Sequence, residues 1–187
     1  MTTPAFDLDP YLHLFRERKI PARTTLLREG QVSRKGYFIK NGCLRLWFNN
    51  HGKDVTFQFF FENEAVSSME SFTTGLPSLF SIESIEPCSI LEISRKNFDL
   101  LKMEMPSYHN FMENILFHRI LHYSKLFLSR IKDSPEQRYL DLLQNHPALL
   151  NRVPQHYIAS FLGITAVSLS RIRKKIGGSR PGHKKDS

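Results

Sequence analysis

The hydrophobic pattern of this chain changes its period at about Ser94, and that change limits the folds it can adopt. Before this point, short apolar runs are separated by turn signals such as Asn41-Gly42 and Asn50-His51-Gly52. An Asn-Gly pair between two such runs favours a tight hairpin between antiparallel strands. After it, apolar residues recur every three or four positions, which is typical of helices. The sequence predicts an α+β fold that opens with an antiparallel β-roll, with strands at 22–27, within 37–61, at 79–85 and at 89–93.

The longest helical pattern spans residues 107–132, after a short helix that Ser94 caps and Pro106 ends. Two apolar stripes run along it, and one of them can cover the open side of the roll. The other needs a second surface, which the same helix of a second copy would supply across a two-fold axis. The alternative is a single helix with a wide buried face. The predicted dimer interface is Met112, Leu116, Ile120, Tyr123, Phe127 and Ile131, and the second stripe is Phe117, Leu121 and Leu128.

Three breaks divide the rest of the chain. Ser134 as N-cap with Pro135 at the first helical position starts a new helix, so residues 133–134 are predicted to be a hinge. His146-Pro147 and Pro154 interrupt the helical pattern again. The predicted organisation is a roll over 1–106, a dimerisation helix over 107–132 and a C-terminal helical domain over 133–187.

The net charge of +8 is concentrated at the C-terminal end. Residues 1–150 carry 18 Lys and Arg against 17 Asp and Glu, whereas residues 151–187 carry eight against one. Charge localised in this way indicates a polyanionic partner, nucleic acid before membrane. A solvated basic face is the alternative that charge alone leaves open.

Two short amphipathic patterns at 155–162 and 166–176 are joined by Gly163, which allows a sharp turn, and Thr165, which is predicted to cap the second. One face of the second pattern is apolar, and the opposite face is small and basic. This arrangement predicts a helix-turn-helix whose second helix enters the major groove, against the alternative of an ordinary helical hairpin. On it, Arg171 can reach a guanine edge or a phosphate, and the lysines would meet phosphates. The predicted DNA-binding residues are Thr165, Ala166, Val167, Ser168, Ser170, Arg171, Lys174 and Lys175.

The stretch IASFLGITAVSLSRIRKKI resembles the DNA-binding helices of the Crp/Fnr family of bacterial transcription regulators. The family's order of a β-roll, a dimer helix, a hinge and a helix-turn-helix also resembles the order predicted here. The resemblance implies a dimeric regulator with a sensor roll, in which a shift of the dimer helix sets the spacing of two recognition helices. GGSRPGHKKDS at the end is too short for the family's full β-hairpin wing and is predicted to be a flexible basic tail. The matching positions are Leu162, Gly163, Thr165, Ser170, Arg171 and Ile172.

The segment that resembles the family's phosphate-binding cassette departs from it. Ser68 stands where cyclic-AMP-binding members carry a Glu, and Ser78 and Leu79 stand where they carry an Arg and a Ser. A half-buried phosphate without a cation is costly, so cyclic AMP is not expected to bind. Any ligand should be more apolar, and the predicted pocket consists of Val66, Ser68, Phe72, Ser78, Leu79 and Phe80.

The sequence contains no motif that indicates a metalloprotein, a disulfide-stabilised protein, a membrane protein or an enzyme. His118 and His122 have the i, i+4 spacing of zinc ligands but no evident third ligand, and two interface or surface histidines are the favoured interpretation. Cys43 and Cys88 are predicted to be small buried hydrophobes in a reducing cytoplasm. No signal peptide, membrane span or catalytic motif is evident, so a non-enzymatic cytoplasmic protein without metal or other cofactor is expected.

The predicted partners are double-stranded DNA and a second copy of the chain, with RNA polymerase as a further candidate and no membrane partner. The alternative function is a small-molecule-binding β-roll module whose basic C-terminal helices do not bind DNA specifically.

Overall fold

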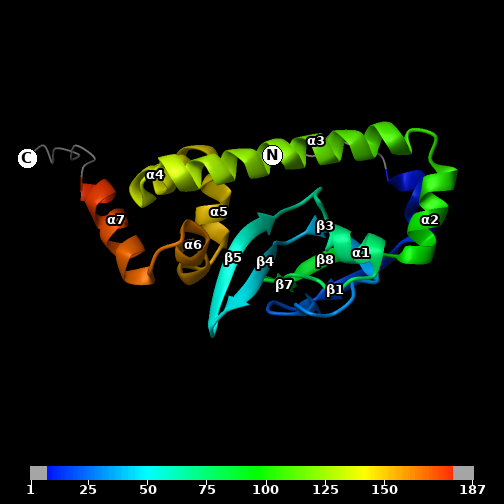
Figure 1. The fold of residues 1–187 in the computed structure, drawn as a ribbon, viewed down its shortest axis with the longest axis horizontal. Coiled ribbons are helices and arrows are strands. Elements are labelled where there is room, and N and C mark those ends of the chain that lie inside the picture. The colour runs from blue at the N-terminus through cyan, green and yellow to red at the C-terminus, as the bar shows by residue number, and fades with distance from the viewer. Residues whose placement is uncertain (1–7, 179–187) are drawn as a thin grey trace, which may run out of the picture. The chain divides into compact units, whose positions relative to one another are not determined.

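The structure is a computed structural model that describes residues 8–178 (Figure 1). The chain forms two compact units, residues 1–126 and 127–187, and the division falls inside the longest helix. The limits predicted for the roll, the dimerisation helix and the C-terminal domain stay a prediction.

The first unit contains two four-stranded antiparallel sheets, which confirms the predicted β-roll. One sheet has the strand order β1-β8-β3-β6 and the other β2-β7-β4-β5. Eleven buried side chains from both sheets form the core between them. The strands are β1 (Arg16–Ile20), β2 (Thr25–Leu27), β3 (Lys35–Asn41), β4 (Leu44–Asn50), β5 (Lys53–Phe60), β6 (Ala65–Val66), β7 (Ser81–Ser84) and β8 (Cys88–Ser94).

Of the two predicted turns, one is a hairpin and the other is not. His51 and Gly52 both have positive φ, at 52° and 85°, and join the paired strands β4 and β5. The hairpin predicted at Asn41-Gly42 is wrong, because β3 and β4 belong to different sheets and the chain crosses between them here. Gly42 has a φ of 106°, and a Cβ on it would lie 2.5 Å from the Cys88 Sγ. The close approach of the connection between β3 and β4 to Cys88 of β8, rather than hairpin pairing, therefore requires this glycine.

The helices begin and end near the predicted breaks. The Ser94 side chain accepts a hydrogen bond from the Asn97 N–H at 3.2 Å, and Ser134 forms a complete capping box with Gln137. The helices are the 3₁₀ helix η1 (Asp9–Leu14), α1 (Met69–Thr74), α2 (Arg95–Glu104), α3 (Tyr108–Lys132), α4 (Pro135–Asn145), α5 (Pro147–Arg152), α6 (Gln155–Leu162) and α7 (Ala166–Gly178).

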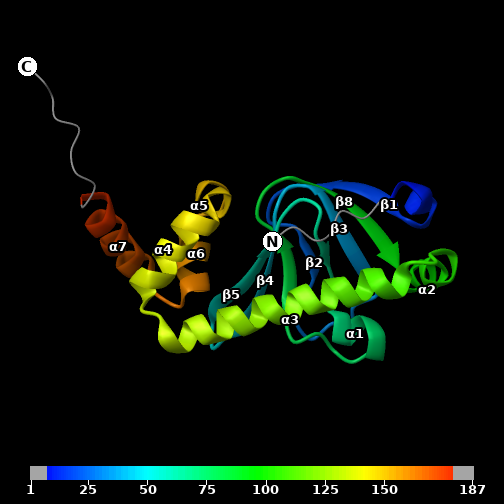
Figure 2. The same ribbon diagram turned by 90° about the horizontal axis from the view of Figure 1, so that it is seen from above.

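Helix α3 carries its apolar side chains without burying any of them fully. In the first unit it passes over the strands of the roll (Figures 1 and 2), where Arg119 donates to the Ala65 carbonyl at 3.0 Å. Phe127 and Ile131, beyond the division between the units, are each 66% exposed. A helix with this much uncovered apolar surface is typical of an interface with another chain.

Candidate nucleic-acid interface and ligand cavity

The turn between α6 and α7 has the geometry that a helix-turn-helix needs. Gly163 has a φ of 69°, its N–H bonds to the Ser160 carbonyl at 2.9 Å, and the Ile164 N–H bonds to the Ala159 carbonyl at 3.0 Å. These two bonds satisfy carbonyls at the end of α6 and turn the chain sharply. Thr165 then accepts from the Ser168 N–H at 3.1 Å, so it caps α7 as predicted.

The faces of α7 are separated as the periodicity predicts. Leu169 is only 1% exposed, and it packs in the unit that also buries Ile158 and Leu162 of α6. On the other face Val167 is 62% exposed. Seven of the eight predicted DNA-binding residues are exposed and Ser168 is partly buried; the exposed ones are Thr165, Ala166, Val167, Ser170, Arg171, Lys174 and Lys175.

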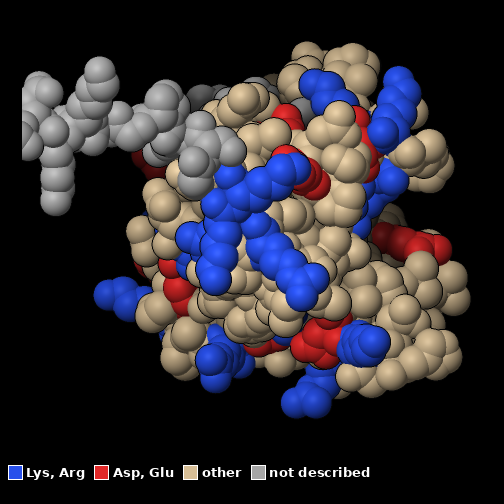
Figure 3. Space-filling model, turned by 90° about the vertical axis from the view of Figure 1, so that its left-hand side faces the viewer, with Lys and Arg blue, Asp and Glu red and all other residues tan. Residues whose placement is uncertain are grey.

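The cations of this face differ in what they contact. Figure 3 is viewed from the side on which α7 lies in Figure 1 and shows Lys and Arg side chains gathered there. Within residues 8–178, neither Arg171 nor Lys174 takes part in a hydrogen bond or an ion pair. Lys175 is instead paired with Glu136 of α4, with its Nζ 2.7 Å from Oε2. Arg171 and Lys174 are therefore better placed than Lys175 to contact an anion.

Two arginines that sequence reasoning missed hold the end of α6. Arg138 of α4 donates to the Leu162 carbonyl at 2.9 Å and to the Asp133 carbonyl at 2.5 Å. Arg130 of α3 donates to the Phe161 carbonyl. Burial lowers the pKa of Arg130, and the charge of Arg138 lowers it further. Cations at the C-terminal end of a helix bind its last carbonyls and oppose its dipole, so this pair ties the hinge region to the turn before α7.

Replacing Arg138 with Met should destabilise the C-terminal unit by about 1–3 kcal/mol, because two carbonyls lose a charged donor. Urea unfolding followed by circular dichroism measures this. Lys132→Met is the matched control, since Lys132 is exposed and its loss should cost about 0.5 kcal/mol or less. Equal stability of the two variants would contradict the role given to Arg138.

The roll contains a cavity of about 440 Å³ that lies within the first unit. Three predicted pocket residues, Val66, Phe72 and Phe80, line it. Leu79 does not, which corrects its place in the predicted pocket: it is 72% exposed, because the chain turns after the buried Ser78 and directs it to solvent.

Ser68 and Ser78, the other two predicted pocket residues, are buried and bonded to each other. The Ser78 Oγ donates to the Ser68 Oγ at 2.9 Å and also lies 2.7 Å from the Phe80 carbonyl. A neutral hydroxyl pair therefore occupies the positions that resemble the family's Glu and Arg. Neither serine is among the cavity-lining residues.

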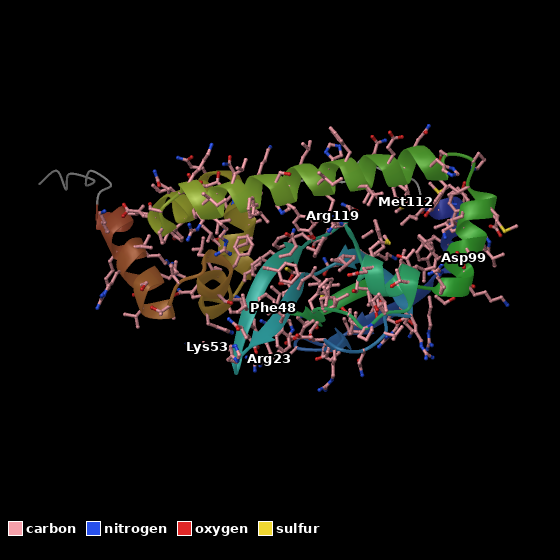
Figure 4. All side chains as sticks on the ribbon, in the orientation of Figure 1. Arg23, Phe48, Lys53, Asp99, Met112 and Arg119 are labelled. Atoms are coloured by element: carbon pink, nitrogen blue, oxygen red, sulfur yellow. The ribbon has the colours of Figure 1, made fainter. Side chains whose placement is uncertain are left out.

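The predicted interface stripe on α3 divides into two parts. Met112, Leu116, Ile120 and Tyr123 line the cavity of the roll, whereas Phe127 and Ile131 do not. Arg119 also lines the cavity, and its guanidinium carbon lies 4.5 Å from the centre of the Phe60 ring. The sequence did not mark Arg119, because its approach to the roll depends on how α3 packs. In Figure 4, Arg119 and Met112 extend from α3 toward the strands.

The histidine pair on α3 has other contacts. The His122 Nε2 lies 3.0 Å from the Gln58 Oε1, and residues 8–178 contain no group of three His, Cys, Asp or Glu side chains that could hold a metal ion. Cys43 and Cys88 are both buried, as predicted. None of the helices in the described part of the chain combines the length and apolarity that crossing a lipid bilayer requires.

Comparison with known protein families identifies the class of the roll. Residues 17–104 match the family model of the cyclic nucleotide-binding domain. No curated protein matches the sequence.

Solved structures extend the match beyond the roll. The c-di-GMP-responsive global regulator CLP from Xanthomonas campestris is 19% identical over 91% of this chain and 90% of its own, with a TM-score of 0.75. A CooA mutant from Carboxydothermus hydrogenoformans is 17% identical over 95% and 86%, and FixK2 from Bradyrhizobium japonicum is 13% identical over 88% and 85%, each with a TM-score of 0.71. The chain therefore has the fold of the Crp/Fnr-type transcription regulators, which confirms the predicted fold.

Proposed function

We propose that this protein is a dimeric, sequence-specific DNA-binding regulator whose roll does not bind cyclic AMP. The observation that carries the DNA-binding part is the outer face of α7, where Val167, Arg171 and Lys174 are exposed while Leu169 holds the helix from behind. Small residues let a helix sit deeply in the major groove, and an unpaired guanidinium can meet a base edge there. The dimer would place two such helices roughly 34–36 Å apart, one turn of DNA.

Selection from random duplexes by the purified protein tests this function. We expect enrichment of a palindrome with half-sites one helical turn apart, and binding that persists at moderate salt. A protein whose basic surface merely attracts polyanions would enrich no sequence and would lose affinity steeply with salt. That result would favour the alternative, a small-molecule-binding roll without specific DNA binding.

Arg171→Ala should weaken the preference for one base pair over the others at one symmetric pair of positions in the site. The free-energy difference between the preferred and the other base pairs should fall there by roughly 1–3 kcal/mol. The reason is that a planar two-pronged donor can bind O6 and N7 of one guanine. Competition binding with single-position variants of the selected site measures the loss.

Lys174→Ala is the matched control for Arg171→Ala. It should weaken binding to all sequences about equally. It should also reduce the slope of log affinity against log salt concentration by about one unit per phosphate contact in each half-site. Should Arg171→Ala instead weaken every sequence alike, Arg171 would be a phosphate contact, and Ala166, Val167 and Ser170 would be left to read the bases.

Cyclic AMP should not bind measurably at micromolar concentration. The cyclic phosphate would need a cation near Ser68 and Ser78, which hydrogen-bond to each other, and placing a charge there unpaired costs several kcal/mol. Titration calorimetry of the intact protein with cyclic AMP checks this, and micromolar affinity would overturn it.

A further inference from the structure

We infer that the cavity of the roll binds a small molecule with an apolar body and one anionic group, as in a medium-chain carboxylic acid. The inference deepens the proposed function, since it names the effector class of the roll. It rests on the lining of the cavity and on Arg119, and both lie within the first unit.

The residues that line the cavity indicate that the body of the ligand is apolar. Aromatic side chains from β3, β5, α1, α2 and α3 line the cavity, among them Phe60, Phe72, Phe98 and Phe111. Its volume of about 440 Å³ lies in the range of small-molecule sites. Protein interiors contain few voids larger than a water molecule, and an apolar void stays dry. An apolar molecule therefore suits this space better than water or a sugar phosphate.

The anionic group follows from Arg119, the only Lys or Arg among the described residues that line the cavity. One N–H of its guanidinium donates to the Ala65 carbonyl, and its guanidinium carbon lies over the Phe60 ring. The side chain is half-buried, and within residues 8–178 no carboxylate lies within ion-pair distance of it. Its other N–H groups can thus donate to the two oxygens of one carboxylate, the pairing for which a guanidinium is shaped.

Two acidic residues near the cavity do not fill this role. Glu64 accepts a hydrogen bond from the Phe61 N–H at 2.7 Å, and burial raises its pKa. Glu70 lines the cavity but is exposed on α1. Neither carboxylate neutralises Arg119 by direct contact, and together they disfavour a ligand with several negative charges. The site suits one anionic group on a hydrocarbon body.

Titration calorimetry with decanoate and 1-decanol, performed on the full chain without DNA, tests the inference. Both probes have the same hydrocarbon length, so the difference between their affinities reports the contribution of the charged group. We expect one decanoate per chain, and at least about tenfold weaker binding of decanol, which corresponds to one charge-assisted hydrogen-bonded pair.

Three variants locate the site. Arg119→Gln should reduce the affinity for decanoate to that for decanol and leave decanol unchanged. Met112→Trp should weaken both probes, because a larger ring from α3 would occupy the cavity that Met112 lines. Lys125→Gln, which removes an exposed cation from the same helix, should change neither.

Equal affinity for the two probes, or a decanoate affinity unaffected by Arg119→Gln, would overturn the anionic part of the inference. No binding of either probe, or an unchanged response in Met112→Trp, would overturn the site itself. Because no DNA is present, these outcomes are separate from a failure of the proposed DNA binding, which the selection experiment reports alone.

Discussion

Replacing Phe127 and Ile131 with aspartate should convert the protein to monomers and lower its affinity for a palindromic site by about 100-fold or more. Both side chains are 66% exposed on α3, in the predicted interface stripe, and neither lines the cavity. Charges placed in an apolar interface between two copies would repel each other and lose their water. Each monomer would then reach only one half-site, and the second contact would no longer be intramolecular.

Light scattering measures the oligomeric state and a mobility-shift assay measures the affinity. Asn114→Asp/Ser124→Asp is the matched control, because it adds the same charge to exposed polar positions of α3. It should leave the dimer intact and lower the affinity only slightly. A Phe127→Asp/Ile131→Asp variant that remains dimeric would show that the copies meet elsewhere, with Phe117, Leu121 and Leu128 as the next stripe to change.

The helical half of the chain was the more predictable one, because its signals are local. Ser94 and Ser134 form their caps within three residues of themselves, and the turn at Gly163 needs only the end of its own helix. Periodicity alone places Leu169 on the buried face of α7 and Val167 on the exposed one.

The roll was less predictable, since its contacts join distant residues. Strand β1 has the sequence RERKI and shows no apolar alternation. It is a strand because it pairs with β8, from Arg16 opposite Glu92 to Ile20 opposite Cys88, and Arg18 bonds to Glu92 at 2.7 Å. The prediction of a hairpin at Asn41-Gly42 was wrong for the same reason, because Gly42 is in close contact with the distant residue Cys88. Local propensity cannot report such pairings.

The same limit applies to the candidate sites. The exposed face of α7 follows from one short segment, whereas Arg119 and Arg138 gain their contacts from carbonyls 54 and 24 residues away. Leu79 was assigned to the pocket because it stands where the resembling family carries a cassette Ser, but its side chain is 72% exposed. Where a side chain points after a turn depends on the fold around it, which the sequence pattern does not contain.

Replacing Arg45 with Met should destabilise the first unit by about 3–5 kcal/mol, because it leaves a buried carboxylate without its cation. Arg45 is 2% exposed in β4 and lies directly opposite Glu83 of β7, with its Nη2 2.8 Å from Oε2. It also donates to the Thr56 hydroxyl at 3.0 Å and lies 4.8 Å from the centre of the Trp47 ring, so the replacement should disturb a packed part of the sheet as well.

Urea unfolding of three variants separates the buried charge from the packing. Asp54→Asn removes the half-exposed partner of Arg45, 3.3 Å away, and should cost about 1 kcal/mol or less. Arg45→Met/Glu83→Met removes both buried charges and should recover most of the stability lost in Arg45→Met, since an apolar pair can replace a buried ion pair at little cost. If the double variant is no more stable than Arg45→Met, the loss comes from packing around Trp47, and the ion pair contributes little to the stability of the roll.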